Sequence, residues 1–245
     1  MCKTPDGGPR SGWQGWLESP QRTPSPPTGP WIDLTHSFSS QVPRAPLFPE
    51  PQFSHFAKMP EADFNISALK TVVHMGTHVD APRHFYEDGP GMDQIPVERL
   101  TGEGVAIKIE KPLFGEIGPE DFEAARPHIQ QGDIVAICMG WAGKWGKPEW
   151  TKHPHLSVNS AKWLIDKKVK LVAIDTMTPE CSDEAPAPND GFPIHCELLK
   201  HGVLISEQVA NLEGVAGKRL EFMFCPMRLT ECDGSPARVL ARQIA

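Results

Sequence analysis

The sequence has no extended basic segment, no apolar run long enough to cross a bilayer and no N-terminal secretory signal. Its formal net charge is −7, and Lys and Arg form no stripe that would attract nucleic acid. We therefore expect a cytoplasmic protein whose partner is a small-molecule substrate, and we expect it to bind neither nucleic acid nor a membrane.

Paired cysteines are also missing. The six cysteines are scattered, and none forms a Cys-x-x-Cys pair. Cys138 and Cys225 lie inside apolar runs, where cysteine behaves as a small hydrophobic residue. In the absence of a secretory signal, all six are expected to be reduced thiols.

Proline is abundant, and seven of the 26 prolines fall within residues 1–30. A segment rich in Pro, Gly and Ser buries too little apolar surface to offset its ordering entropy, so residues 1–30 are expected to form a flexible arm. Trp13, Trp16 and Leu17 are the exception, because they could dock the arm onto the body. No linker divides the rest, and residues 31–245 are expected to form a single domain.

The body alternates strand and helix signals. Gly118-Pro119 and Ser157 are typical of helix starts, because Pro favours the first helical position and a Ser side chain caps free backbone N–H groups. Residues 198–212 are expected to form a helix, a short strand and a second helix. Strands are expected at 31–35, 66–73, 105–109, 133–139, 170–175, 220–223 and 238–244. The pattern predicts an α/β protein (mixed α+β).

The segment 74–84 holds three histidines and one aspartate within eleven residues. Imidazole and carboxylate ligands together suit Zn, Mn, Fe or Co, and no cysteine lies nearby. A lone histidine would be read as an ordinary loop residue, but the spacing His-x-x-x-His-x-Asp with a further His is more specific. The segment predicts a divalent metal site.

The spacing also limits the backbone. Metal–ligand bonds are roughly 2.0–2.2 Å long, so the donor atoms must converge. A straight helix would turn Asp80 away from His74 and His78, and a straight strand would spread the three over roughly 20 Å. The chain must bend, and Gly76 permits the bend. We expect the ligands on an irregular turn between elements.

The pattern His-x-Gly-Thr-His-x-Asp-Ala-Pro-x-His at 74–84 resembles the signature of the cyclase-type metal-dependent hydrolases, which include bacterial kynurenine formamidases and isatin hydrolases. The resemblance extends along most of the chain from residue 31, through the segments 33–35, 139–141 and 175–179. It implies a swivelling β/β/α domain that assembles as a homodimer or homotetramer.

The resemblance also implies roles for individual residues. His84 would be the proton-transfer residue. One or two ions per chain, Zn or Mn, would be bound, and a second ion would share Asp80 with the first. The implied ligands are His74, His78 and Asp80 for the first ion, and Asp80, His195 and Glu207 for the second.

Other readings of single residues stay open. His195 taken alone is also compatible with a surface position, and Glu207 with a solvated acid at a helix start; the two gain weight only as a pair. Asp175 ends an apolar strand, where α/β enzymes often place functional groups, but an Asp there also begins turns. His153 and His155 lie in a polar loop and are expected to take no part.

The implied reaction is hydrolysis of the C–N bond of a small aryl amide or cyclic amide, such as N-formylkynurenine or isatin, by a water activated by the metal. A pocket wall formed by aromatic residues, Trp141 among them, would suit such a substrate. Two alternatives remain: a lactonase, lactamase or other cyclase on the same site, and a non-catalytic metal- or ligand-binding protein. His84 argues against the second alternative, because a protein that only binds has no need of a proton shuttle.

Overall fold

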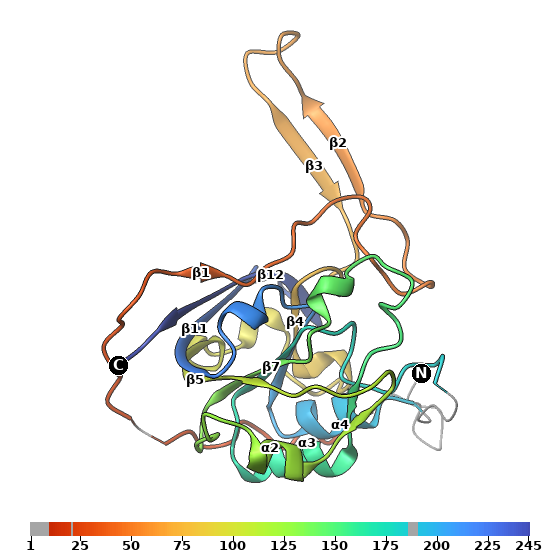
Figure 1. The fold of residues 1–245 in the computed structure, drawn as a ribbon. Coiled ribbons are helices and arrows are strands. Elements are labelled where there is room, and N and C mark those ends of the chain that lie inside the picture. The colour runs from red at the N-terminus through yellow and green to blue at the C-terminus, as the bar shows by residue number, and fades with distance from the viewer. Residues whose placement is uncertain (1–9, 21, 186–190) are drawn as a thin grey trace.

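The computed structural model describes residues 10–20, 22–185 and 191–245. Within these residues, twelve strands and four short α-helices make up the fold (Figure 1). The strands are β1 (Ile32–Asp33), β2 (Gln52–Ala57), β3 (Ile66–Lys70), β4 (His78–Asp80), β5 (Thr101–Lys108), β6 (Glu116–Ile117), β7 (Ile134–Cys138), β8 (His155–Leu156), β9 (Leu171–Ile174), β10 (Leu204–Glu207), β11 (Lys218–Pro226) and β12 (Gly234–Gln243). The helices are α1 (Val97–Leu100), α2 (Pro119–Ala124), α3 (Val158–Asp166) and α4 (Pro193–Lys200), with 3-10 turns η1 (Pro82–His84), η2 (Met92–Gln94), η3 (Ala142–Lys144) and η4 (Leu212–Gly214).

Seven strands close into a mixed barrel in the order β12-β11-β5-β7-β9-β10-β4, with β4 pairing back onto β12. Strands β5, β7, β9 and β10 run parallel, and α2, α3 and α4 lie in the crossovers between them. The other pairings are antiparallel. The mixed α/β class is confirmed, whereas the swivelling β/β/α arrangement stays a prediction.

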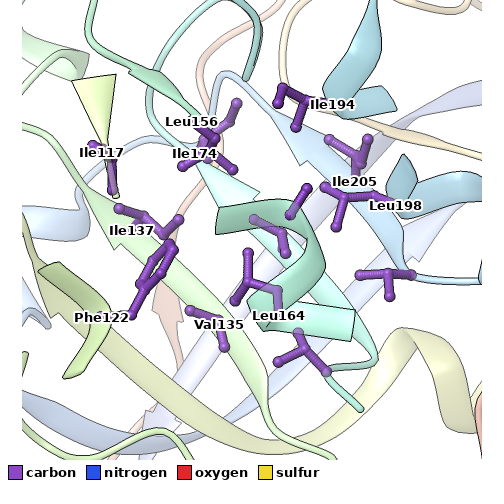
Figure 2. Close-up of a cluster of buried hydrophobic side chains, with 14 of the residues drawn as sticks. Ile117, Phe122, Val135, Ile137, Leu156, Leu164, Ile174, Ile194, Leu198 and Ile205 are labelled. Atoms are coloured by element: carbon purple, nitrogen blue, oxygen red, sulfur yellow. The ribbon is translucent and has the colours of Figure 1, made fainter. Parts of the chain in front are cut away.

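Alternating side chains of the parallel strands enter two separate cores. Ala106 and Ala136 belong to a cluster that draws residues from all seven barrel strands and fills the barrel interior. Ile107 and Ile137 point the other way, into a cluster shared with the helices. Figure 2 shows this second cluster, in which Leu164 of α3 packs against the sheet.

The predicted helix starts are confirmed by their caps. The Ser157 hydroxyl accepts a hydrogen bond from the Ser160 backbone N–H at 3.0 Å, and α3 follows. The Gly118 backbone N–H donates to the Asp121 carboxylate at 2.8 Å, with Pro119 at the first position of α2. After β10 the chain forms a 3-10 turn, so the second helix expected within 198–212 is absent there.

The described part of the N-terminal arm lies along the body. Trp13 and Leu17 pack against the helix-side core, and the Gln14 backbone N–H donates to the carbonyl of Lys200 at 2.9 Å. Residues 1–9 and 21 fall outside the described residues, and the flexibility of the arm stays a prediction. Cys138, Cys225 and Cys232 are free thiols, and Cys2 lies outside the described residues. In the same residues no helix combines the length and apolar character that a membrane span requires.

Candidate metal centre

The centre is built on β4, a three-residue strand at which the barrel closes. His78 and Asp80 lie two residues apart, so their side chains share one face of the strand, while Val79 points into the barrel interior. The predicted irregular turn is therefore wrong for His78 and Asp80. The expected turn is found at His74 instead. This residue lies in the bend before β4, where Gly76 adopts a φ of +65°.

The pairing of β4 brings distant residues to the same face. On one side, Glu207 of β10 lies directly opposite His78. On the other side, Gly234 of β12 lies opposite Asp80, with Asp233 just before it. Helix α4 supplies His195 from the outer face of the barrel. The six residues expected to act at the site therefore lie together in one centre, outside the barrel interior.

Two glycines allow the ring of His74 and the bend to pack closely. A Cβ atom at position 234 would lie 2.5 Å from Cε1 of His74, so a larger residue would displace the imidazole. A Cβ atom at position 76 would lie 2.9 Å from the ring of Phe38, and the positive φ is unfavourable for other residues. Glycine is therefore required at positions 76 and 234 for His74 to reach its position.

The separations between donor atoms fit a shared ion. Nε2 of His78 lies 3.3 Å from Oδ1 of Asp80 and 3.4 Å from Oε2 of Glu207. Nε2 of His195 lies 3.1 Å from Glu207 and 3.6 Å from Oδ2 of Asp80. Two ligands of one tetrahedral ion with bonds of roughly 2.1 Å stand about 3.4 Å apart. His78 Nε2 and Asp80 Oδ2 are buried and lack hydrogen-bond partners, so both atoms are suited to bind a cation.

The other ring nitrogen of each histidine fixes its orientation. Nδ1 of His78 donates to the carbonyl oxygen of Gly76 at 2.8 Å, which leaves Nε2 free for a metal. Nδ1 of His195 donates to the carboxylate of Glu180 at 2.9 Å, and the same carboxylate accepts the His195 backbone N–H at 2.8 Å. Glu180 therefore holds His195 in the orientation in which Nε2 points to Glu207.

Neighbouring carboxylates raise the pKa of two imidazoles, those of His74 and His195, and so favour their protonated forms. Burial alone would lower the pKa of His74, but hydrogen bonds from its ring to Asp233 and Asp80 outweigh burial and raise it to about 10. The pKa of His195 is raised well above 6.5, because hydrogen bonds to three carboxylates likewise outweigh its burial. The ring nitrogens thus carry positive charge where a divalent ion would sit, and metal binding would release these protons.

His84 occupies a more open position than the other histidines of the centre. It ends η1, and its ring stacks on that of His74 with centroids 3.9 Å apart. Its Nδ1 lies 3.3 Å from the carboxylate of Asp233, which also receives a hydrogen bond from His74 at 3.0 Å. The His84 side chain is 26% exposed, against 1% for His78. Burial nevertheless lowers the pKa of His84 below 6.5, so its ring is neutral at pH 7.

Aromatic rings border this open side. The Phe85 ring stacks on His195 at 5.0 Å between centroids, and the Phe192 ring stands 5.6 Å from Phe85. Phe192 is 38% exposed and presents an apolar surface beside the centre. Trp141 was the residue expected in such a wall, but it is buried and donates its ring N–H to the carbonyl of Trp150 at 2.9 Å.

Asp175 organises the chain around it. Its carboxylate is buried and accepts hydrogen bonds from the backbone N–H groups of Met139 and Trp141 at about 3 Å. Burial raises its pKa to about 6, although these hydrogen bonds act in the opposite direction. Asp175 thus fixes the turn after β7, whereas the sequence offered it as a functional group or as the start of its own turn.

Two histidines expected in a polar loop are buried. His153 is fully buried, its Nδ1 donates to the carbonyl of Pro154 at 2.9 Å, and His155 begins β8. Burial lowers the pKa of His153 to about 4. The expectation of a polar loop was wrong, because two histidines around a proline do not reveal that His153 is buried and that His155 pairs with β6.

Acidification is therefore expected to destabilise the protein through His153. The unfolded chain gains this proton near pH 6.5 and the folded chain only near pH 4, so stability is complete above pH 6.5 and falls as the pH drops. Between about pH 6.5 and pH 5 the loss attributable to His153 is about 2 kcal/mol. Urea unfolding of the wild type and of His153→Asn at both pH values measures it. His128→Asn, at an exposed position, is the control. Equal pH dependence in all three proteins would contradict the assignment.

Sequence reasoning missed two residues of the centre, Glu180 and Asp233. Each acts through a histidine that lies far away in sequence, Glu180 on His195 and Asp233 on His74 and His84. Neither has a spacing signal of its own. The only local indication is that Asp233 precedes Gly-Ser-Pro, a turn signal just before a predicted strand.

Buried imidazoles and carboxylates with metal-like separations make the site a candidate divalent-metal centre. The sequence profile of the family described as "Putative cyclase" matches residues 32–181, and the chain belongs to this cyclase family.

The chain is also similar along most of its length to characterised and solved proteins. It is 28% identical to kynurenine formamidase of Bacillus cereus, over 89% of this chain and 99% of that protein. A structure described as a potential metal-dependent hydrolase with cyclase activity is 26% identical, with a TM-score of 0.72 over 89% of this chain and all of that one. Isatin hydrolase A from Ralstonia solanacearum superposes with a TM-score of 0.77 at 18% identity, over 88% and 92% of the two chains, and shares the fold.

Proposed function

We propose that the chain is a metal-dependent hydrolase that cleaves the C–N bond of a small aryl amide or cyclic amide. The observation that carries the proposal is the partly exposed His84, with its neutral ring beside a set of metal-ligand donors and beside the rings of Phe85 and Phe192. A site that only stored a metal would need the donors alone.

We propose that the metal ligands form two groups that share Asp80. Its Oδ1 lies toward His74 and His78, and its Oδ2 lies toward His195. A carboxylate has two oxygens and can serve two ions, so His74, His78 and Asp80 would hold the first ion. The second ion would be held by Asp80, His195 and Glu207. Zn or Mn is the proposed metal, and it would polarise the substrate carbonyl and lower the pKa of a water ligand toward neutrality.

His84 is the proposed proton-transfer residue. Its Nδ1 faces the carboxylate of Asp233, which fixes the ring and leaves Nε2 free to accept a proton. The lowered pKa keeps the ring neutral at pH 7, so it can take a proton from the attacking water and deliver it to the departing nitrogen. Asp233 orients the base as a carboxylate partner does in other hydrolases.

The aromatic border supports an aryl substrate. Phe85 and Phe192 offer flat apolar faces next to His195, and a planar aromatic ring stacks on such faces. An aryl amide also has a better leaving nitrogen than an alkyl amide. N-formylkynurenine, the substrate that the name of the Bacillus cereus relative implies, and isatin are therefore the first compounds to assay.

Turnover should depend on metal and on the aryl group. After dialysis against a chelator, activity on N-formylkynurenine or isatin is expected to disappear and to return on addition of Mn or Zn. The matched comparison is an N-formyl alkylamine, which should react at least 100-fold more slowly, because it loses the stacking contacts and the better leaving group. Full activity in protein shown by elemental analysis to be metal-free would refute the proposal. Turnover of lactones in preference to both amides would instead favour the lactonase alternative.

A further inference from the structure

The described part of the N-terminal arm encloses a cavity of about 250 Å³ against the barrel. The arm contributes Ser19 and Arg22 to its wall, and the barrel contributes Gly102 of β5 and Lys170, which immediately precedes β9. A Cβ atom at position 102 would lie 2.6 Å from Nζ of Lys170, so glycine there leaves room for the ammonium group. These barrel residues lie where the parallel strands begin, whereas Glu207 of the metal centre ends β10. The cavity and the metal centre therefore lie at opposite ends of the parallel strands.

Two neighbouring cationic side chains at this cavity lack carboxylate partners. Lys170 is partly buried, and its ammonium donates to the carbonyl oxygens of Thr101 at 2.7 Å and Glu98 at 3.2 Å. Arg99 is 8% exposed and donates through Nη2 to the carbonyl of Leu17, while its buried Nη1 has no hydrogen-bond partner. Among the described residues, neither cation forms an ion pair.

This arrangement is unfavourable for both cations. Burial lowers the pKa of Lys170, and the charges of Arg99 and Arg22 lower it further, although Asp133 and Glu103 act in the opposite direction. Burial also lowers the pKa of Arg99. Removing a charge from water is costly when no opposite charge accompanies it. A bound anion would therefore stabilise both side chains in their charged forms.

Two carboxylates also line the cavity, but each of them is engaged elsewhere. Glu103 accepts a hydrogen bond from the backbone N–H of Ser25, and Glu221 pairs with the guanidinium of Arg242 at 2.5 Å. Neither of them forms an ion pair with Lys170. Positive charge at the cavity wall is thus left without a matching side chain.

We propose that this cavity binds a small oxyanion of the phosphate type, with Arg22 and Lys170 as its ligands and Arg99 adding positive charge nearby. Two of the three N–H donors of Lys170 are used on carbonyl oxygens, and one is left. Arg22 donates through Nη1 to Asp133 at 2.7 Å and through Nη2 to the carbonyl of Gln131, and each of these nitrogens has a second N–H. The class of ligand follows from these donors, because charged N–H groups bind phosphate-type oxygens strongly.

The size and position of the cavity limit the ligand and its effect. Pockets for drug-sized ligands have volumes of roughly 300–1,000 Å³, so this smaller cavity suits a small ion. Arg22 belongs to the arm and Lys170 to the barrel, so an anion between them would fasten the arm to the barrel. This binding is independent of the reaction proposed at the metal centre.

Calorimetric titration of the full chain with inorganic phosphate, at constant ionic strength, tests the proposal. The wild type is expected to bind phosphate, and chloride at the same ionic strength should give no binding. Lys170→Met keeps the aliphatic stem and removes the charge, so it should weaken phosphate binding about 10-fold or more. Lys162→Met, at an exposed position on α3, is the matched control and should bind as the wild type does. Arg22→Gln should weaken binding as well, and it tests the site if Lys170→Met does not fold.

Limited digestion with trypsin tests whether the anion fastens the arm. Phosphate should slow cleavage after Arg22 in the wild type but not in Lys170→Met, because a held segment opens less often to the protease. Cleavage after Arg44, which is exposed and lies outside the cavity, should not change. A wild type that binds no phosphate at about 10 mM would overturn the proposal, since binding weaker than this is negligible. Phosphate binding that Lys170→Met and Arg22→Gln leave unchanged would also overturn it, because the ion would then lie elsewhere, for example at the metal centre.

Discussion

Replacing His78 with alanine is expected to remove the metal and to lower turnover about 10³-fold or more, because the metal contributes several kcal/mol of transition-state stabilisation. His78 is the best-defined donor in the centre. Its Nδ1 is held by the carbonyl of Gly76, and its buried Nε2 has no hydrogen-bond partner. Alanine leaves the buried carboxylate of Asp80 with one partner fewer, so a loss of stability is expected as well.

Metal content measured by elemental analysis, beside kcat, checks this prediction. Added Zn or Mn should raise the melting temperature of the wild type, since a ligand that binds only the folded state stabilises it, and should have little effect on His78→Ala. His128→Ala removes an exposed histidine and should match the wild type in both measurements. A His78→Ala protein with the metal content of the wild type would show that His78 is not a ligand.

Alanine at position 84 is expected to behave differently: the protein keeps its metal and loses about 10²–10⁴-fold in kcat, the usual contribution of a positioned general acid or base. The physical reason is the partial exposure of His84 and the orientation of its ring by Asp233, which together leave one nitrogen facing the open side of the centre. Folding should be little affected, because His84 lies at the end of a short 3-10 turn rather than in either core.

Metal stoichiometry and kcat measured side by side for His84→Ala and His78→Ala decide between the two roles. Donor atoms of His84, Asp80 and His195 lie within 4.8 Å of one another, so the position would also permit coordination. Loss of metal from His84→Ala would make His84 a ligand. Retention of both metal and rate would mean that another group transfers the proton, and Glu207 would be the next candidate.

The sequence predicted those residues of the centre that lie close together along the chain. The pattern at 74–84 carries four of the residues within one bend, one short strand and one 3-10 turn, and the positive φ of Gly76 is the conformation that the spacing required. It could not show that 78–80 forms a strand, because β4 has three residues and exists through its pairing with β10 and β12. The roles of Glu180 and Asp233 depend on the same long-range pairing.

The two-stranded sheet of β2 and β3 shows a second limit of the sequence. Nothing in the sequence marks the phenylalanines at 53 and 56 as exposed, because aromatic residues are more often buried. In the structure both are exposed on β2. A single sequence does not distinguish an apolar strand that packs inside its own domain from one that projects from it, because both have the same composition. Strands β7 and β9 were predicted more reliably, because every residue in them is buried and they appear as continuous apolar runs.

The order of β4 along the chain has a consequence for biosynthesis. β4 is made early, whereas β10 and β12, between which it is inserted, follow after more than a hundred further residues. At typical rates of translation, residues 74–84 wait on the order of 10–30 s on the nascent chain before β12 has been made. During that time the segment offers its histidines to any metal ion as a loose peptide chelator. The folded barrel therefore determines which metal is bound, because it adds the remaining proposed ligands and fixes the geometry of the site. Protein made in metal-poor cells should accept its ion after folding.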